Sequence, residues 1–382
     1  MKNVEFSDFK MSFELKQAIE RMGFEKPTDV QALAIPPALK GEDILAQAQT
    51  GTGKTIAFGI PILNKLFLDD KSPQAIVICP TRELAMQVSK ELKKLGQYMD
   101  GLKVSSVYGG QPIGRQIRVL KKGVHIVVGT PGRIIDHINK GTLDLIGVET
   151  VVLDEADEML DMGFREDIEK ILKFTPKQRQ TLLFSATFPK EIRNLATKYQ
   201  NNPKNLKVTK KELTVSNVEQ YYYEAREKQK LDTLTTLLNV YDLRKTLVFC
   251  NTKRRVDKLA DDLKARGYAV SGIHGDLKQE LRDKAMARFR NGKLDVLVAT
   301  DVAARGIDIV DIEAVFNYDL PHDNESYVHR IGRTGRAGRT GYAFTFVAGK
   351  EIYRLRDIED YAKTEIIKQK VPSFKQMDEI KN

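Results

Sequence analysis

Residues 43–55 read DILAQAQTGTGKT, and this stretch decides the fold. The apolar DILAQ predicts a buried strand, and IAFGIPILNKL (56–66) predicts a helix. Between them, AQTGTGKT (48–55) fits the phosphate-binding pattern G-x-x-x-x-G-K-[ST], with Ala48 in place of the first glycine. In that pattern, backbone amides turn inward on phosphate oxygens and the helix N-terminus adds partial positive charge. An ordinary Gly-rich turn is the alternative, but the strand–loop–helix context favours a nucleotide site.

Two adjacent carboxylates complete the predicted site about a hundred residues downstream. VVLDEAD (151–157) is an apolar strand that ends in Asp154 and Glu155. We expect Asp154 and Thr55 to hold Mg²⁺ and Lys54 to reach the β- and γ-phosphates. Glu155 fits a general base that activates water, although an acid cluster at a helix N-terminus is the alternative. The predicted loop contacts to the nucleotide are Ala48, Gln49, Thr50, Gly51, Thr52, Gly53, Lys54 and Thr55.

Strand-like and helix-like segments alternate along most of the chain, which predicts an α/β fold with parallel sheets. The short apolar runs are AIVIC (75–79), HIVVG (125–129), TVVLD (150–154), TLLFS (181–185), TLVFC (246–250), VLVAT (296–300) and AVFNY (314–318). They form two groups, and the polar stretch KVTKKELTVSNVEQYYYEA (207–225) separates them. We therefore predict two doubly wound parallel-sheet lobes, residues 1–206 and 217–367, joined by a flexible linker at 207–216. Residues 368–382 would form a short polar tail, and Tyr221–Tyr223 an edge strand that opens the second lobe.

Composition narrows the class of protein. The 382 residues carry 62 basic and 52 acidic side chains, a net charge of +10. This excess fits either ordinary solubility or a polyanionic partner that both halves contact. The sequence contains no run of about 18 apolar residues, so it predicts no membrane span. The first residues, MKNVEFSDFK, lack the apolar region of a secretory signal. Cys79 and Cys250 each lie in an apolar stretch, which predicts buried thiols and a reducing, cytoplasmic setting.

Asp154–Asp157 spell DEAD, and the surrounding motifs resemble those of the DEAD-box branch of superfamily 2 helicases over about residues 4–350. The resemblance implies two RecA-like lobes and ATP as the nucleotide. GFEKPTDVQ (23–31) resembles the family's adenine-reading motif, which implies that Gln31 bonds the adenine edge and that Phe24 packs on its face, supported by Phe6. In SAT (185–187), the resemblance implies that Ser185 and Thr187, with Asp157, couple the ATP state to closure of the lobes.

A cluster of arginines marks the second lobe. YVHRIGRTGRAGR (327–339) places Arg330, Arg333 and Arg336 three residues apart, and planar guanidinium groups suit phosphate. A nucleic-acid contact patch or a solvated basic loop is the alternative. The resemblance implies that Arg333 and Arg336 are arginine fingers at the γ-phosphate and that His329 lies near the SAT hydroxyls and Asp157. In TDVAARGIDI (300–309), it implies that Asp308 contacts the ribose.

Loops with small residues, Thr and Arg recur after the predicted strands. Thr hydroxyls, backbone amides and Arg can hold successive phosphates without reading bases, whereas each residue taken singly is typical of a turn or cap. The resemblance assigns these loops to the backbone of single-stranded RNA. The implied contacts are Thr81, Arg82, Gly110, Thr130, Arg133, Lys253, Arg254, Gly275, Arg282 and Thr300.

The resemblance thus implies RNA-stimulated ATP hydrolysis coupled to local unwinding of RNA duplexes without sequence specificity. The second hypothesis is an ATP-gated RNA clamp with slow turnover, which would serve as a binding platform. A DNA helicase of the same superfamily is the third, and the adenine motif and DEAD, rather than DEAH, argue against it. Protein partners in RNP, RNA-decay or ribosome-assembly complexes are also consistent with the family.

Overall fold

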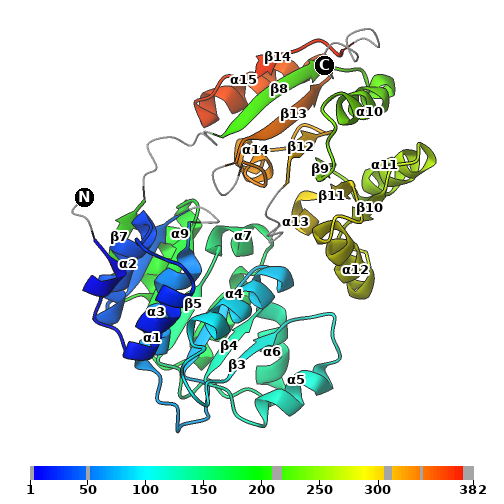
Figure 1. The fold of residues 1–382 in the computed structure, drawn as a ribbon. Coiled ribbons are helices and arrows are strands. Elements are labelled where there is room, and N and C mark those ends of the chain that lie inside the picture. The colour runs from blue at the N-terminus through cyan, green and yellow to red at the C-terminus, as the bar shows by residue number, and fades with distance from the viewer. Residues whose placement is uncertain (1–3, 49–51, 209–216, 305–311, 336–338, 373–382) are drawn as a thin grey trace. The chain divides into compact units, whose positions relative to one another are not determined.

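The chain divides into two compact units, Met1–Thr209 and Lys210–Asn382, in the computed structural model (Figure 1). The structure describes residues 4–48, 52–208, 217–304, 312–335 and 339–372. Each unit is built on its own seven-stranded sheet, and every strand pairing in both sheets is parallel. The predicted fold class of two RecA-like α/β lobes is therefore confirmed.

The first sheet has the strand order β3-β4-β2-β5-β6-β1-β7. Its central strands are buried throughout, which agrees with their continuous apolar sequences. Helices cover both faces, and the side chains between helices and sheet form two apolar clusters, one on each side. The strands are β1 (Ile44–Gln47), β2 (Ala75–Ile78), β3 (Val104–Val107), β4 (Ile126–Gly129), β5 (Thr150–Leu153), β6 (Gln180–Ser185) and β7 (Lys204–Lys207).

The helices of the first unit connect these strands and follow the predicted pattern. RELAMQVSKELKKLG, for example, forms α4, whose buried residues recur with helical spacing from Leu84 to Leu95. The helices are α1 (Phe13–Arg21), α2 (Asp29–Leu39), α3 (Lys54–Lys65), α4 (Arg82–Leu95), α5 (Ile113–Leu120), α6 (Pro131–Asn139), α7 (Ala156–Asp161), α8 (Arg165–Phe174) and α9 (Lys190–Tyr199), with a 3₁₀ turn at Phe6–Asp8.

The second sheet repeats the order of the first, as β10-β11-β9-β12-β13-β8-β14. Its strands are β8 (Val218–Glu224), β9 (Thr246–Phe249), β10 (Val270–Ile273), β11 (Val296–Ala299), β12 (Ala314–Asn317), β13 (Gly341–Val347) and β14 (Ile367–Lys368). Its helices are α10 (Lys230–Val240), α11 (Lys253–Ala265), α12 (Gln279–Arg290), α13 (Asp301–Ala304), α14 (Asn324–Ile331) and α15 (Glu351–Ala362), with a 3₁₀ turn at Glu227–Gln229.

The structure corrects one expectation about the strands. Tyr221–Tyr223 do belong to the first strand described in the second unit, but β8 is not at the edge, because β13 and β14 pair with its two sides. β14 was not predicted, because two residues are too few to show a strand pattern. Of the predicted linker 207–216, Lys207 is the last residue of β7, and residues 209–216 lie outside the described part of the chain.

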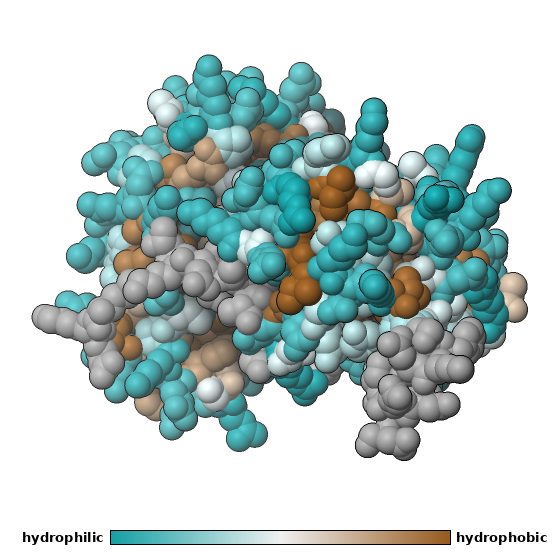
Figure 2. Space-filling view, turned by 90° about the horizontal axis from the view of Figure 1, so that it is seen from above, coloured by the Kyte–Doolittle hydropathy of each residue, from teal (hydrophilic) through white to brown (hydrophobic). Residues whose placement is uncertain are grey.

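Most large apolar side chains on the surface are scattered. Figure 2 shows a face on which hydrophilic residues predominate, with separate hydrophobic areas between them. Phe13, Ile146 and Tyr353 are the most exposed of the large apolar residues and come from different elements. Within the described residues, no helix combines the length and the apolar character that crossing a membrane requires.

Candidate functional site

Three neighbouring strands of the first sheet bring the predicted nucleotide motifs together. The sheet places β5, β6 and β1 side by side, and Asp154 follows β5, Ser185 ends β6 and Ala48 follows β1. The Ala48 amide donates to the Ser185 carbonyl oxygen at 2.9 Å. Because these strands are parallel, their carboxyl ends meet at one edge, which is where ligands bind in such sheets.

Lys54 and Asp154 form a buried ion pair. Lys54 is the first residue of α3, and its Nζ lies 3.5 Å from Asp154 Oδ1, with 6% and 3% of the side chains exposed. Neither atom has a hydrogen-bond partner among the described residues. Burial opposes the charge of Lys54, but the carboxylates of Asp154, Glu155 and Asp157 outweigh it and raise its pKa. Burial also raises the pKa of Asp154 to about 6, against the attraction of Lys54.

These orphaned atoms fit a triphosphate with Mg²⁺. A buried amine and carboxylate without hydrogen bonds are costly unless a ligand satisfies them. Mg²⁺ in phosphate sites takes only one or two protein ligands and completes its shell with water and phosphate oxygens. Asp154 and the half-buried hydroxyl residue Thr55, second in α3, supply such ligands. The donor set therefore fits the metal that the sequence predicts.

Glu155 has an unusual backbone. Its φ of 52° is left-handed, and it is one of four non-glycine residues with positive φ among those described. A left-handed glutamate costs free energy and persists only where its surroundings hold it, which occurs often at functional sites. Glu155 caps the N-terminus of α7 and is 6% exposed. The sharp turn after β5 places Glu155 directly after Asp154, and the carboxylates of both residues act on the charge of Lys54.

The predicted coupling residues Asp157, Ser185 and Thr187 form one hydrogen-bonded group. Asp157 Oδ2 accepts from the Thr187 amide at 2.8 Å and from its Oγ1 at 3.0 Å. Ser185 Oγ donates to the Thr187 carbonyl oxygen at 2.7 Å and accepts from the Asp157 amide at 3.3 Å. The last acid of the DEAD motif is therefore joined directly to the SAT segment at the end of β6.

Gln31 lies against the phosphate loop. Its Nε2 donates to the Gly53 carbonyl oxygen at 3.1 Å, and its Oε1 accepts from the Thr28 amide at 2.9 Å. Gly53 has a φ of +86°, and a Cβ there would lie 2.3 Å from Gln31 Nε2, so two constraints require glycine. The amide keeps one N–H and one lone pair for adenine. Phe24, 39% exposed, lies 6.3 Å from the buried Phe6 ring.

The five predicted RNA contacts of the first unit follow β2, β3 and β4, which are neighbours in the sheet. Arg82 begins α4 and lies so close to Gly110 that a Cβ there would be 1.9 Å from Arg82 Nη1. Thr81 caps α4 by accepting from the Leu84 amide, and Thr130 is the N-cap residue of α6. Arg133, with 12% of its side chain exposed, donates to the Gln111 carbonyl oxygen at 3.0 Å.

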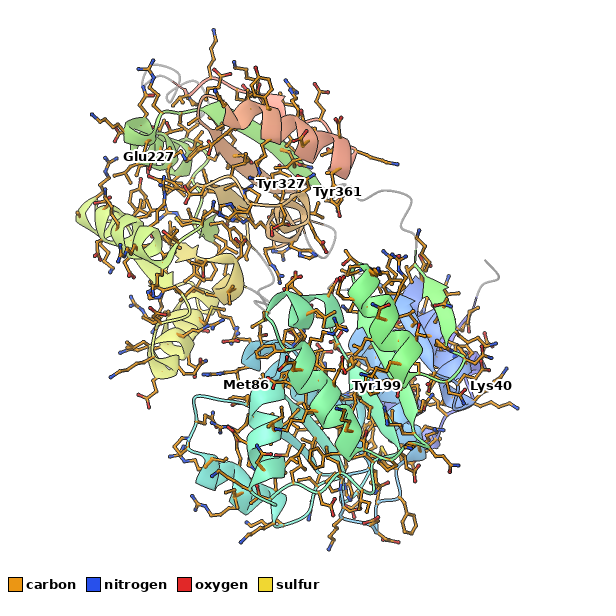
Figure 3. The ribbon with its side chains drawn as sticks, turned by 180° about the vertical axis from the view of Figure 1, so that it is seen from behind. Lys40, Met86, Tyr199, Glu227, Tyr327 and Tyr361 are labelled. Atoms are coloured by element: carbon orange, nitrogen blue, oxygen red, sulfur yellow. The ribbon has the colours of Figure 1, made fainter. Side chains whose placement is uncertain are left out.

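Arg330 in the second unit is structural, which corrects its place in the predicted phosphate cluster. Its side chain is 1% exposed and forms a two-bond ion pair with Asp301, at 2.6 and 2.7 Å. It also donates to Asn251 Oδ1 at 2.8 Å and to the Asp319 carbonyl oxygen at 2.7 Å. Tyr327, labelled in Figure 3, is fully buried one turn earlier on the same helix. Arg330 therefore links α14 by hydrogen bonds to residues that follow β9, β11 and β12.

The structure describes only some of the predicted catalytic and nucleotide contacts in the second unit. Arg333 is 8% exposed and follows α14. His329 is half-buried, with its Nε2 3.9 Å from Glu325 Oε1. The predicted site residues Asp308 and Arg336 of this unit lie outside the described residues, as do Gln49, Thr50 and Gly51 of the first unit.

The predicted RNA contacts of the second unit also follow three neighbouring strands, β9, β10 and β11. Lys253 is an exposed residue paired with Asp276, next to the exposed Gly275. Arg282 donates to the Ala303 carbonyl oxygen at 2.7 Å. The others are exposed Arg254 and half-buried Thr300.

A buried polar network that was not predicted from the sequence joins the loops of the first unit that carry the predicted RNA contacts. Gln116 Nε2 donates to the Tyr108 carbonyl oxygen at 2.9 Å, and its Oε1 accepts from Arg133 Nη1 at 3.1 Å. His137 Nε2 lies 3.0 Å from the same Oε1. Burial lowers the pKa of His137, and the charge of Arg133 adds to this effect. The available signal was a polar Gln116 on a helix whose other buried residue is Leu120.

Comparison with known proteins agrees with the site geometry. Residues 28–195 match the family DEAD/DEAH box helicase, and residues 229–338 match the helicase conserved C-terminal domain. The chain is 56% identical to the DEAD-box ATP-dependent RNA helicase CshA of Geobacillus kaustophilus over 97% of this chain and 79% of the relative. It is 55% identical to CshA of Bacillus subtilis over 97% of this chain and 75% of that relative.

The chain also resembles solved structures over nearly its whole length. Dbp5 of S. cerevisiae bound to RNA and ADP BeF3 superposes with a TM-score of 0.88 and 34% identity, over 99% of this chain and 98% of that one. Mss116p bound to ssRNA and AMP-PNP has a TM-score of 0.87 and 30% identity, over 98% and 81%. On these matches and on its motifs, the chain belongs to the DEAD-box family of ATP-dependent RNA helicases.

Proposed function

We propose that this protein hydrolyses ATP in response to RNA and uses the cycle to unwind short RNA duplexes and remodel RNA–protein complexes locally, without sequence specificity. One observation carries the proposal. The buried amine of Lys54 lies 3.5 Å from Oδ1 of the buried Asp154, and neither atom has a hydrogen-bond partner in the described part of the chain. A triphosphate with its metal satisfies both groups, because the amine bonds phosphate oxygens and the carboxylate binds the cation.

Each group in this pocket has a distinct role in the proposal. Lys54 holds the β- and γ-phosphates, while Asp154 and Thr55 bind Mg²⁺, which neutralises charge on the phosphates when bound. Glu155 accepts the proton of the attacking water, since its strained backbone fixes the carboxylate beside Asp154. Gln31 bonds the adenine edge with its remaining N–H and lone pair, and Phe24 packs on the ring, while Asp308 contacts the ribose.

Coupling to RNA in this proposal depends on the second unit. Arg333 and Arg336 stabilise charge on the γ-phosphate, and His329 meets the group formed by Asp157, Ser185 and Thr187. This role is supported by the three hydrogen bonds that join Asp157 to Ser185 and Thr187 at the end of β6. RNA would favour closure because it binds loops of both units, and a ligand shifts an equilibrium toward the state it binds best.

The proposed RNA site reads the backbone. The contacts on both units are hydroxyl, guanidinium, ammonium and glycine residues at strand ends, which can bind successive phosphates. Such contacts carry no information about base sequence, so the protein should accept many RNAs.

The experiment that tests this proposal compares ATPase rates with no nucleic acid, with RNA, and with DNA of the same sequence. We expect RNA to stimulate turnover and DNA to have little effect. Equal stimulation by both would contradict RNA as the substrate. Tight ATP-dependent binding of RNA without stimulated turnover would instead indicate the ATP-gated clamp.

The nucleotide preference gives a second test. Replacing Gln31 by Ala removes the amide that we assign to adenine, so we expect weaker preference for ATP over GTP. The measurement is the ratio of kcat/KM for the two nucleotides. An unchanged ratio would contradict the adenine-reading role and leave Gln31 with only its contacts to Gly53 and Thr28.

The proposal also keeps the predicted setting and organisation. A reducing cytoplasm is supported by two free, buried cysteines, Cys79 and Cys250. We retain lobes at 1–206 and 217–367, a linker at 207–216 and a tail at 368–382. Partners in RNA-decay or ribosome-assembly complexes remain part of this proposal.

A further inference from the structure

The segment 101–135 has a one-sided charge. It contains six basic residues and not a single Asp or Glu. In the chain as a whole, basic and acidic residues are nearly balanced, at 62 to 52. The basic residues are Lys103, Arg115, Arg118, Lys121, Lys122 and Arg133. Such a concentration at one place is the electrostatic signature of a polyanion-binding surface.

Helix α5 and the turn after it space three of these charges along one side. Arg115 and Arg118 lie on the helix, and Lys122 lies two residues past its end. All three are exposed, and their spacing of three and four residues is that of one helical stripe. The opposite face is buried through Gln116 and Leu120. At 1.5 Å per residue, the stripe is about 10 Å long, and each of its three cations can meet a phosphate of a strand that runs along it. We call these three residues the α5 stripe.

The α5 stripe begins next to the RNA contacts proposed above. The exposed Gly110 and Gln111 lie just before α5 in the chain. Arg133 donates to the Gln111 carbonyl oxygen, and the Gln116 amide donates to the Tyr108 carbonyl oxygen. These bonds fix the start of α5 against the loop after β3 and the first turn of α6. Figure 1 shows α5 beside α6, and β3 is the edge strand of the sheet.

The basic groups of the stripe are available to a ligand. Among the described residues, no carboxylate forms an ion pair with Arg115, Arg118 or Lys122. Arg118 Nε donates a hydrogen bond to the Gly114 carbonyl oxygen at 3.4 Å, which lies on the same helix. At the far end, Lys103 Nζ donates to the Lys122 carbonyl oxygen at 3.0 Å and adds a fourth charge. A solvated helix face usually mixes both signs of charge, which this one does not.

We infer that the α5 stripe binds the phosphates of the RNA strand where it continues beyond the loops after β2, β3 and β4. This inference rests on the proposed function, because the stripe extends that same RNA site. It predicts a longer binding footprint than those loops alone provide. Short RNA that fills only the loops does not reach the stripe, whereas longer RNA does.

The test is a charge reversal with a matched control. The variant R115E/R118E/K122E removes the stripe. The control K170E/K173E/K177E changes three exposed lysines with the same spacing of three and four residues, on and just after α8. Both variants change the net charge by six, but acidic residues Glu166, Asp167 and Glu169 already surround the control positions. Affinity is measured with ATP analogue present, for RNA of about 6 and about 20 nucleotides, over a range of salt.

We expect the stripe variant to lose about tenfold in affinity for the long RNA and to keep its affinity for the short one. For three lost phosphate contacts, the slope of log K against log salt should fall by about 2, at about 0.7 per contact with single strands. The control should keep parental affinity for both RNAs. Because Glu near the end of α5 opposes the helix dipole, R115Q/R118Q/K122Q serves as a second variant that removes charge without this cost.

The outcomes separate this inference from the proposed function. If the parent binds RNA with ATP and both stripe variants keep its affinity and salt slope for long RNA, the stripe is wrong and the proposed function stands. Equal losses in the stripe and α8 variants would also overturn the stripe, since the effect would then be one of net charge. If the parent itself does not bind RNA, the proposed function fails and the stripe with it.

Discussion

The two units share one strand order but differ in the surroundings of a lysine that occupies the corresponding position in each. Lys54 begins α3 after β1, and Lys230 begins α10 after β8, the strand that corresponds to β1. Each faces an acid that follows the corresponding central strand. Lys54 Nζ lies 3.5 Å from Asp154, and Lys230 Nζ lies 3.7 Å from Asp319. In the first pair, Lys54 Nζ and Asp154 Oδ1 have no hydrogen-bond partner among the described residues.

The second pair is satisfied by its own unit. Asp319 also pairs with Arg255 at 2.8 Å and accepts from the Asn251 amide at 3.0 Å. Lys230 pairs with Glu227 at 3.4 Å, the residue labelled in Figure 3, and lies over the Tyr318 ring. The comparison teaches that an identical framework gives a ligand site only where the chain leaves charge unsatisfied. In the second unit, the corresponding lysine and acid interact with other residues of the same unit.

We expect the largest effect from a substitution that disrupts the ion pairs and hydrogen bonds at the strand ends of the second unit. Arg330→Met would remove every bond to Asp301, Asn251 and the Asp319 carbonyl, and leave the Asp301 carboxylate unpaired. We expect a loss of about 3 kcal/mol in the free energy of unfolding of the second unit, at the low end for a buried pair because 28% of the Asp301 side chain is exposed. Ten of the 13 tyrosines lie in Lys210–Asn382. Tyrosine near-UV circular dichroism during denaturation therefore reports mainly on this unit, and an unchanged midpoint would contradict the structural role.

The next effect concerns catalysis in the first unit. Glu155→Gln keeps the shape of the side chain but removes the base, so we expect steady-state ATP hydrolysis to fall by about 10²-fold or more. Binding of ATP and RNA should persist. Glu227→Gln, which changes an acid of the second unit in the same way, should leave turnover at the parental rate. Parental turnover in the Glu155 variant would refute the proposed base.

A pair of lysine variants tests the comparison directly. Lys54→Met should weaken ATP binding about tenfold or more, since a charge-assisted hydrogen bond contributes about 1.5–3 kcal/mol. Lys230→Met should leave ATP binding unchanged. Calorimetric titration with ATP and Mg²⁺ measures both variants, and equal losses in the two would show that the units do not differ as argued.

A smaller effect is expected at Gly53. Gly53→Ala places a side chain at a φ of +86° and 2.3 Å from Gln31 Nε2, so it should cost about 1–2 kcal/mol in stability. Gly101→Ala has a similar φ of +78° with nothing within 4 Å, so it measures the backbone cost alone. The excess at Gly53 is the cost of moving Gln31. Equal unfolding midpoints for the two variants would contradict the close contact.

The smallest effect concerns the cysteines, one in each unit. Cys79 follows β2 and Cys250 follows β9, the corresponding strand, and both are fully buried. Burial raises the pKa of both thiols, so the reactive thiolate is scarce near pH 8. We expect both to react slowly with a thiol reagent in the native protein and rapidly in denaturant. Fast native labelling of one cysteine would show that its unit is less well packed.

Local sequence carried much of the prediction. The seven apolar runs became strands of the two parallel sheets, because buried parallel strands need continuous apolar sequence. Most of the missed strands lacked such runs, although β13, with GYAFTFV (341–347), has one. VSSV of β3 is half polar, VSGI of β10 contains glycine, and β14 has two residues. Their pairing depends on neighbours distant in the chain, which single-sequence reasoning does not see.

By itself, the sequence determined the strand–loop–helix of residues 43–66, the acids that end β5 and the order of the motifs, because each depends on residues adjacent in the chain. Only the tertiary structure decided which charges are satisfied. Arg330 seemed equivalent to Arg333 in the sequence, but its partner Asn251 lies 79 residues away. Likewise, the fold alone turned Gln116 inward and Arg115 outward. Burial and hydrogen bonding are properties of the assembled sheet, and they separate a ligand site from a structural one.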